Sequence, residues 1–205
     1  MNTCNNNYEG ESNLPLQHFK NIHKDEMCLL LGNGPSLAEI PLEFLQKNIT
    51  IGANTIFKGF TPNYYTAVDT RVFVEFREEV DRMSSIKFFP SPKLEMWIGE
   101  DTYFWDHKEV EMPGNLETGI NYHCIMHVQM QIADYMGFSK ILTVIDHSVD
   151  NREKFWGVDE AQPGIGKIDK WAEGYKKIRE GIGAEMYNIA PLTRLPDRII
   201  PWMPL

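Results

Sequence analysis

A short glycine-rich loop follows the first apolar run of the chain, residues 27–31, and has the composition of an anion-binding turn. Its residues are Gly32, Asn33, Gly34, Pro35 and Ser36. The glycines permit positive φ and close approach of a ligand, and a helix beginning after them would offer free N–H groups and partial positive charge. We predict a phosphate, ribose or carboxylate at this loop; a strand-to-helix turn without a ligand stays open as the alternative.

The spacing within this loop separates it from the two commonest phosphate-binding motifs. Counting from Gly32, the third glycine of the dinucleotide fingerprint GxGxxG is missing. No Gly-Lys-Ser or Gly-Lys-Thr follows, so the loop is not a P-loop either. The nature of the ligand must therefore be inferred from other residues.

Polar side chains also follow three further apolar runs, and they are Asn54, Asp69, Asp146 and His147. An amide both donates and accepts, as contacts with a base or ribose require. An aspartate is able to hold a ribose hydroxyl, a divalent ion or a proton in transfer. His147, with Asp146, is the candidate for acid-base chemistry. A turn asparagine, helix N-caps and a surface histidine are the structural alternatives.

Thr118 and Gly119 are predicted to open the longest helix, which would run from about Gly119 to Met136. A hydroxyl and bare N–H groups there would form a second anion-binding helix start facing the first; simple capping is the alternative. His123 and His127 stand four apart and share a face of this helix. The neighbouring glutamate of a His-Glu-x-x-His motif is missing, so we predict no metal site.

The elements that must position these residues alternate between strand and helix. Continuous apolar runs such as residues 27–31 and 141–145 are typical of strands covered on both faces by helices. Such alternation implies a mostly parallel sheet, whose ligands lie beyond the carboxyl ends of the strands. We predict an α/β fold of Rossmann-like type with three layers and helices on both faces. One rim would then hold the strand-end candidates.

Weaker patterns fill the intervals between these strands. Further strands are predicted at residues 49–53, 64–68, 86–89 and 185–189. Helices are predicted across 70–83, across 169–180, and from the glycine loop to about 47, with a start only at Pro41 as the alternative for the last. Residues 93–115 suit a hairpin or an insertion over the sheet edge. Trp97, Phe104 and Trp105 in this stretch suit a subunit contact in a homo-oligomer or, as the favoured use, burial.

The chain is predicted to be one domain preceded by a flexible tail. Residues 1–14 are rich in Asn, Glu and Ser, with too few apolar groups to repay the entropy of ordering. Residues 15–205 suffice for one full core, since 42% of the chain is hydrophobic. Within this domain, residues 148–167 are predicted to form a loop or lid.

The charge balance limits the class of partner. Lys and Arg number 20 against 29 Asp and Glu, a formal charge of −9. Long nucleic acids are therefore excluded as partners, because their phosphates are bound by clustered cations. Backbone N–H groups hold small anions without net positive charge, so we predict a nucleotide or nucleotide-sugar as the partner.

Cysteine usage and hydropathy predict a soluble, cytoplasmic protein. Cys4, Cys28 and Cys124 form no CxxC pair, and their odd number and wide spacing fit neither a disulfide framework nor a zinc site. Cys28 and Cys124 lie in apolar runs and are interpreted as buried, inert thiols. No apolar stretch approaches the roughly 18 residues that span a bilayer, and the first residues are polar where a signal peptide is apolar.

Taken in this order, these residues resemble two related families. They are the family-42 bacterial sialyltransferases and the MptE-like domains, which include archaeal pterin pyrophosphokinases. The resemblance rests on residues 31–37 with Ile40, on 51–54, on 62–69, and on Thr118-Gly119 with 133–146. In the sialyltransferases the matching positions bind a cytidine nucleotide, which implies nucleotide contacts at Asn33, Asn54, Asp69, Thr118 and Gly119.

Several positions depart from the sialyltransferase pattern. Asp69 falls where that family has an Asn, Thr118 belongs to a Glu-Thr-Gly that replaces Thr-Ser-Gly, and His147 follows Asp146 where the family has aromatic residues. The family's catalytic histidine belongs between the lid and the last helix, and residues 162–169 contain none. The donor and the catalytic base are therefore expected to differ.

The preferred interpretation is a glycosyltransferase acting on a CMP-sugar or similar donor, with no assigned cofactor. Helix N-termini would stabilise the nucleotide leaving group, and the lid would close over an acceptor. Two alternatives stay open. A pyrophosphokinase-like enzyme would hold Mg²⁺ between Asp69 and Asp146 for phosphoryl transfer. A binding domain would have kept the pocket and lost the chemistry, which the missing histidine favours.

Overall fold

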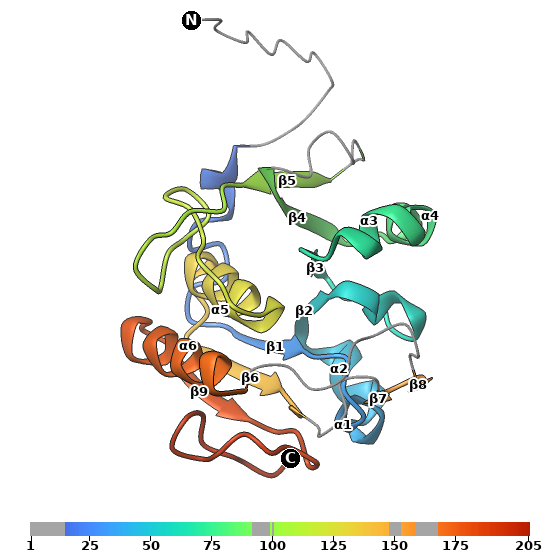
Figure 1. Ribbon diagram of the computed structural model, residues 1–205, viewed down its shortest axis with the longest axis vertical. Coiled ribbons are helices and arrows are strands. Elements are labelled where there is room, and N and C mark those ends of the chain that lie inside the picture. Colours follow the sequence, from blue (N-terminus) through green and yellow to red (C-terminus); the bar gives the residue numbers. More distant parts are fainter. Residues whose placement is uncertain (1–14, 92–98, 100, 148–152, 159–167) are drawn as a thin grey trace, which may run out of the picture.

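Seven parallel strands form the central sheet of the protein, described here from a computed structural model covering residues 15–91, 99, 101–147, 153–158 and 168–205. The strands are β1 Met27–Leu31, β2 Ile49–Ala53, β3 Tyr64–Thr66, β4 Ile86–Pro90, β5 Thr102–Trp105, β6 Lys140–Val144 and β9 Glu185–Asn188. Their order across the sheet is β5-β4-β3-β2-β1-β6-β9, and every neighbouring pair is parallel (Figure 1). A separate antiparallel pair joins β7 Glu153–Lys154 to β8 Gly157–Val158.

Helices cover both faces of this sheet, as predicted. They are η1 Leu16–Phe19, α1 Ser36–Glu39, α2 Leu42–Lys47, η2 Asn54–Lys58, α3 Thr70–Glu75, α4 Arg77–Arg82, α5 Ile125–Met136 and α6 Ile168–Gly181. In Figure 1, α5 and α6 lie to the left of the strands and α1 to α4 to the right. The α/β fold of Rossmann-like type with three layers is therefore confirmed.

Alternate residues of β1 enter two different hydrophobic cores. Cys28 and Leu30 pack in the core that includes α5 and α6, whereas Leu29 and Leu31 pack in the core that includes α1 to α4. All four side chains are fully buried. Burial of each leucine contributes about 1.5–3 kcal/mol. A strand that is apolar on both faces is expected at the centre of a sheet. β1 indeed lies between β2 and β6.

Proline explains where the first predicted helix divides. The expected helix from the glycine loop to residue 47 is split into α1 and α2, with Ile40 extended at ψ 125° between them. Pro41 lacks an N–H and disfavours the helical conformation of the residue before it. The predicted strand at 64–68 likewise ends earlier, at Thr66, and Asp69 caps α3.

The stretch that was predicted as a hairpin or insertion instead supplies the edge strand β5, which pairs in parallel with β4. Trp105 is 1% exposed and packs in the core, so the favoured prediction, burial, is confirmed for this residue. Trp97, the tail 1–14 and much of the predicted lid lie outside the described residues. In the described part of the chain, no helix has the length and apolar character needed to cross a membrane.

Candidate functional site

The chain changes direction across the sheet at β1. It runs outward from β1 through β2, β3, β4 and β5, then passes through α5 to β6 on the other side of β1. Ligands of open parallel sheets bind beyond the carboxyl ends of the strands at such a switch point. We use the term switch edge for Gly32–Ser36, Asn54, Asp146, His147 and the first turn of α5.

Glycines bring the loop after β1 against the end of β6. A Cβ on Gly32 would lie 2.5 Å from the carbonyl oxygen of Val144, and a Cβ on Gly34 would overlap the carboxylate of Asp146. Both contacts are shorter than atoms tolerate, so a side chain at Gly32 would require a shift of the backbone, and one at Gly34 a shift of the loop or of the Asp146 carboxylate. The two glycines are therefore required here for close packing of β1 against β6.

The first turn after the loop is occupied by protein groups. The backbone N–H of Ser36 donates to Oδ2 of Asp146 at 2.9 Å, and its hydroxyl accepts from the N–H of Leu192 at 2.9 Å. Ser36 is fully buried. The N–H group that the sequence offered to a phosphate is thus bound to the carboxylate of Asp146.

Three side-chain amides meet the ends of β1 and β2. Asn33 donates to the carbonyl oxygen of Ala53 at 2.9 Å, and Gln129 of α5 donates to those of Leu31 and Ile51 at 3.3 and 2.8 Å. Asn54 follows β2 directly, with φ at +50°. The buried amide oxygens of Asn33, Asn54 and Gln129 have no hydrogen-bond partner among the described residues. Acceptors that are buried in this way favour a ligand with N–H or O–H donors.

The longest helix on this face of the sheet begins at the switch edge. Met126, in its first turn, has its sulfur 3.8 Å from the position of a Cβ on Gly32. The N-cap residue is Cys124, in place of the usual Ser, Thr, Asp or Asn. Because a thiol is only a weak acceptor, the partial positive charge of this helix start has no strong cap.

His147 lies between the end of β6 and α6. Its ring stacks on that of Trp171, with centroids 4.9 Å apart, and its Nε2 lies 3.0 Å from the hydroxyl of Tyr175. Its backbone is left-handed, with φ at +43°. Burial lowers the pKa of His147 to about 4, so the imidazole is neutral at pH 7.

His127 is a structural residue of the same region. Its Nδ1 accepts from the backbone N–H of His123 at 3.2 Å, and its Nε2 donates to the carbonyl oxygen of Trp171 at 3.1 Å. Burial lowers its pKa to about 4 as well. Both ring nitrogens are engaged, and no group of three metal-binding side chains occurs among the described residues.

The β7–β8 pair packs over the glycine loop. The backbone N–H of Phe155 donates to the carbonyl oxygen of Asn33 at 3.1 Å. The Phe155 ring lies where a Cβ on Gly59 would be, at 2.6 Å from Cε2. Lys58 in turn lies over the Trp156 ring, with 5.2 Å from Nζ to the centroid. Within residues 153–158, the predicted lid thus contacts the switch edge.

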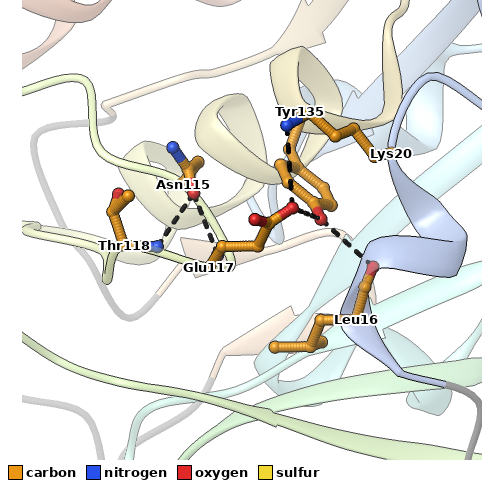
Figure 2. Close-up of polar contacts among 6 residues, drawn as sticks. All are labelled: Leu16, Lys20, Asn115, Glu117, Thr118 and Tyr135. Carbon is orange, nitrogen blue, oxygen red and sulfur yellow. Dashed lines mark hydrogen bonds and ion pairs between the residues drawn. The ribbon is translucent and has the colours of Figure 1, made fainter.

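The structure does not place Thr118 and Gly119 at the start of a helix, so that prediction is wrong. Figure 2 shows Asn115 bound through its side chain to the N–H groups of Glu117 and Thr118, both at 2.9 Å. Asn115 and Gly119 exchange backbone hydrogen bonds, and the N–H of Ile120 donates to Asp106 after β5. These bonds hold the segment as a turn and a bridge, so α5 begins only at residue 125.

This turn contacts the opposite end of α5 from the switch edge. The carboxylate of Glu117 accepts from the hydroxyl of Tyr135, in the last turn of α5, at 2.5 Å and lies 3.7 Å from Nζ of Lys20 (Figure 2). The carbonyl oxygen of Leu16 lies 3.3 Å from the same hydroxyl. Met126 and Tyr135 are nine positions apart on one helix, about 14 Å. In the described part of the chain, no hydrogen bond joins Thr118 to the glycine loop.

Asp69 is a capping residue. Its Oδ1 accepts from the backbone N–H of Arg71 at 2.9 Å, and the side chain lies at the surface after β3. Three strand spacings separate the ends of β3 and β6, which is about 14 Å. Asp69 and Asp146 are therefore too far apart to share one small cation.

The residues predicted from the resemblance to bind a nucleotide fall into two groups in the structure. Asn33 and Asn54 lie with Asp146 at the switch edge, whereas Asp69 and Thr118 lie apart from it. No model of a known protein family matches the chain. The geometry of the switch edge therefore carries the functional argument.

Sequence reasoning missed Gln129, Trp171 and Tyr175, which lie beside this edge. Gln129 lies inside a helix most of whose residues are buried, and a glutamine within such an apolar stretch is the signal that could have found it. Trp171 and Tyr175 lie one turn apart on α6, but nothing local indicates that they face His147. Of the two thiols predicted to be buried, Cys28 is buried and Cys124 is half-buried, although burial raises the pKa of both.

Proposed function

We propose that the protein binds a nucleotide or nucleotide-sugar at the switch edge and acts as a glycosyltransferase on a CMP-sugar or a similar donor. The observation that carries the proposal is the set of buried amide oxygens at the ends of β1 and β2. They belong to Asn33, Asn54 and Gln129, and none has a partner among the described residues. The amino group of a base and the hydroxyls of a ribose are the matching donors.

The start of α5 supports an anionic group beside these amides. Its first turn carries the partial charge of a twelve-residue helix, and the thiol of Cys124 compensates it weakly. A phosphate there would be held by backbone dipoles, consistent with a chain whose formal charge is −9. Charge that develops on a leaving phosphate would be stabilised by the same dipoles.

Asp146 and His147 are the candidate catalytic groups. Asp146 fixes the loop through the N–H of Ser36, and His147 is a neutral imidazole at the end of β6. The Mg²⁺-dependent pyrophosphokinase is less well supported, because its two aspartates follow strands about 14 Å apart. A binding domain without catalysis predicts the same affinity and no turnover.

Thermal unfolding with CMP, UMP, GMP, AMP, ATP and CMP-sialic acid, each with and without Mg²⁺, tests the proposal. A cytidine ligand that binds only the folded state at 100 times its Kd adds about 2.7 kcal/mol of stability. Asn54→Gly removes one amide and tolerates the positive φ, so it should weaken binding about tenfold. Asn48→Ala is the control: it removes the side-chain amide of another asparagine, which donates to the carbonyl oxygen of Phe44 at the end of α2, outside the switch edge.

The outcomes separate the candidate functions. Stabilisation by cytidine nucleotides without metal, with release of the sugar from CMP-sialic acid, supports the transferase. The same binding without release supports the binding domain. Stabilisation by ATP that depends on Mg²⁺ supports the pyrophosphokinase and contradicts the transferase.

A further inference from the structure

Three side chains, the fully buried Tyr175 and the half-buried Cys124 and His147, form a hydrogen-bonded chain that ends on His147. The sulfur of Cys124 lies 3.2 Å from the hydroxyl oxygen of Tyr175, which lies 3.0 Å from Nε2 of His147. Tyr175 is fully buried in the core under α6. The three residues come from the start of α5, from α6 and from the end of β6, so only the folded chain assembles them.

Each member of this chain is protonated once at neutral pH. Burial raises the pKa of the Cys124 thiol and that of the Tyr175 phenol, and lowers the pKa of His147 to about 4. The thiol is therefore S–H, the phenol is O–H, and the imidazole carries a proton on one nitrogen only. What remains to be decided is the direction in which each hydrogen bond is donated.

The strengths of the two acceptors decide that direction. Tyr175 has one proton, and it can go to the imidazole nitrogen or to the thiol sulfur. A thiol is a weak acceptor, whereas the unprotonated nitrogen of an imidazole is a good one. Tyr175 therefore donates to Nε2 of His147, and the S–H of Cys124 donates to the phenol oxygen.

We propose that Tyr175 is a positioning residue that fixes His147 as the Nδ1–H tautomer, so that this histidine offers a hydrogen-bond donor to an anionic oxygen at the switch edge. The partner of one ring nitrogen sets the proton on the other. Nδ1 of His147 has no hydrogen-bond partner in the described ranges, 15–91, 99, 101–147, 153–158 and 168–205. The identity of the anionic oxygen rests on the proposed function; the tautomer does not.

This assignment gives His147 a role other than that of a base. A lone pair bound by the O–H of Tyr175 is not available to remove a proton from an acceptor. A neutral N–H beside the start of α5 instead stabilises negative charge on a leaving phosphate oxygen, without transfer of a proton. In a transferase of this design, the group that deprotonates the acceptor would be another residue.

His127 is an internal reference for the test. Its contacts require the Nε2–H tautomer, because Nδ1 accepts from a backbone N–H and Nε2 donates to a carbonyl oxygen. Two neutral histidines of one protein are thus expected to be opposite tautomers. Nitrogen-15 NMR of the imidazole rings distinguishes a protonated from an unprotonated ring nitrogen directly.

The experiment uses the full chain at pH 7, with His147→Asn and His127→Gln to assign the resonances. In the wild type, His147 should show a protonated Nδ1 and His127 a protonated Nε2. Tyr175→Phe keeps the buried ring but removes the hydroxyl, so a measurable fraction of His147 should move its proton to Nε2. Cys124→Ala keeps the Tyr175 bond, and His147 should stay in the Nδ1–H form.

A protonated Nε2 on His147 in the wild type would overturn the assignment, as would a spectrum of His147 that Tyr175→Phe leaves unchanged. If Tyr175→Phe fails to fold, the wild type and Cys124→Ala still decide the tautomer. Addition of CMP should then shift Nδ1 of His147 more than either nitrogen of His127. A chain that binds no nucleotide but keeps Nδ1–H on His147 overturns the proposed function and supports the tautomer.

Discussion

The carboxylate of Asp146 accepts a hydrogen bond from the backbone N–H of Ser36 at 2.9 Å, which links the end of β6 to the first turn after β1. A hydrogen bond to a buried charged group contributes about 1.5–3 kcal/mol. We expect Asp146→Ala to lower the free energy of unfolding by about 2 kcal/mol, measured by urea denaturation at pH 7. Asp146→Asn should lose less, because its amide oxygen still accepts. Equal losses in the two variants would contradict this explanation.

Gly34 is predicted to tolerate no side chain. A Cβ there would overlap the carboxylate of Asp146, so Gly34→Ala must displace either the loop or that carboxylate. Strain of this kind costs about 1–3 kcal/mol, and we expect a corresponding loss of stability in thermal unfolding. Gly183→Ala is the control, since a Cβ on Gly183 meets nothing within 4 Å. Similar behaviour of the two variants would show that Gly34 is not sterically required.

The β7–β8 pair is expected to detach when its docking position is filled. A Cβ on Gly59 would lie 2.6 Å from the ring of Phe155, so Gly59→Ala should push this ring away. The N–H of Phe155, now bound to the carbonyl oxygen of Asn33, should then exchange with solvent at least tenfold faster. Hydrogen exchange read by NMR measures it. Unchanged protection of this amide would mean that the ring does not hold the pair in place.

Acid should destabilise the protein through its buried histidines. The pKa of His127 and that of His147 are about 4 in the folded chain, against an ordinary value of 6.5. The unfolded chain therefore binds protons that the folded chain rejects. Stability is fully present above pH 6.5 and is lost as the pH falls towards 4, at up to about 1.4 kcal/mol per pH unit for each histidine.

The variant His127→Gln should remove one of these two contributions. Urea denaturation between pH 4 and 7 should then show about half of the slope that these two histidines give the wild type, with the remainder from His147. A full wild-type slope in His127→Gln would place the acid sensitivity in other groups.

The strands of the centre could be predicted because burial on both faces leaves a continuous apolar run. Residues 27–31 and 141–145 are such runs. The strands that they predict, β1 and β6, pair in parallel along their whole length. Their adjacency brings Gly34 to Asp146, and this contact joins residues more than a hundred positions apart. Local patterns contain no information on such pairing. The sequence therefore predicted that these residues lie at one edge of the sheet, but not which of them are in contact.

Thr118 and Gly119 show where local reasoning fails. A Thr-Gly pair before a helical pattern resembles a cap, but the backbone of Ile120 is bound to Asp106 after β5. The parallel bridge between His107 and Ile120 keeps this segment beside the sheet, and the helix begins only later, at Ile125. The hydrogen bond between Tyr175 and His147 could not be predicted from local patterns either, because it joins α6 to the segment after β6, 28 positions apart in the chain.

The central position of β1 has a consequence for the order in which the chain can fold during synthesis. β2 leaves the ribosome soon after β1 and can pair with one of its sides, but the other side must wait for residues 140–144. Until then, β1 is an exposed apolar edge of the kind that recruits other chains. A fragment that stops before β6 should therefore aggregate, and the nascent protein completes its switch edge only when most of the chain has been made.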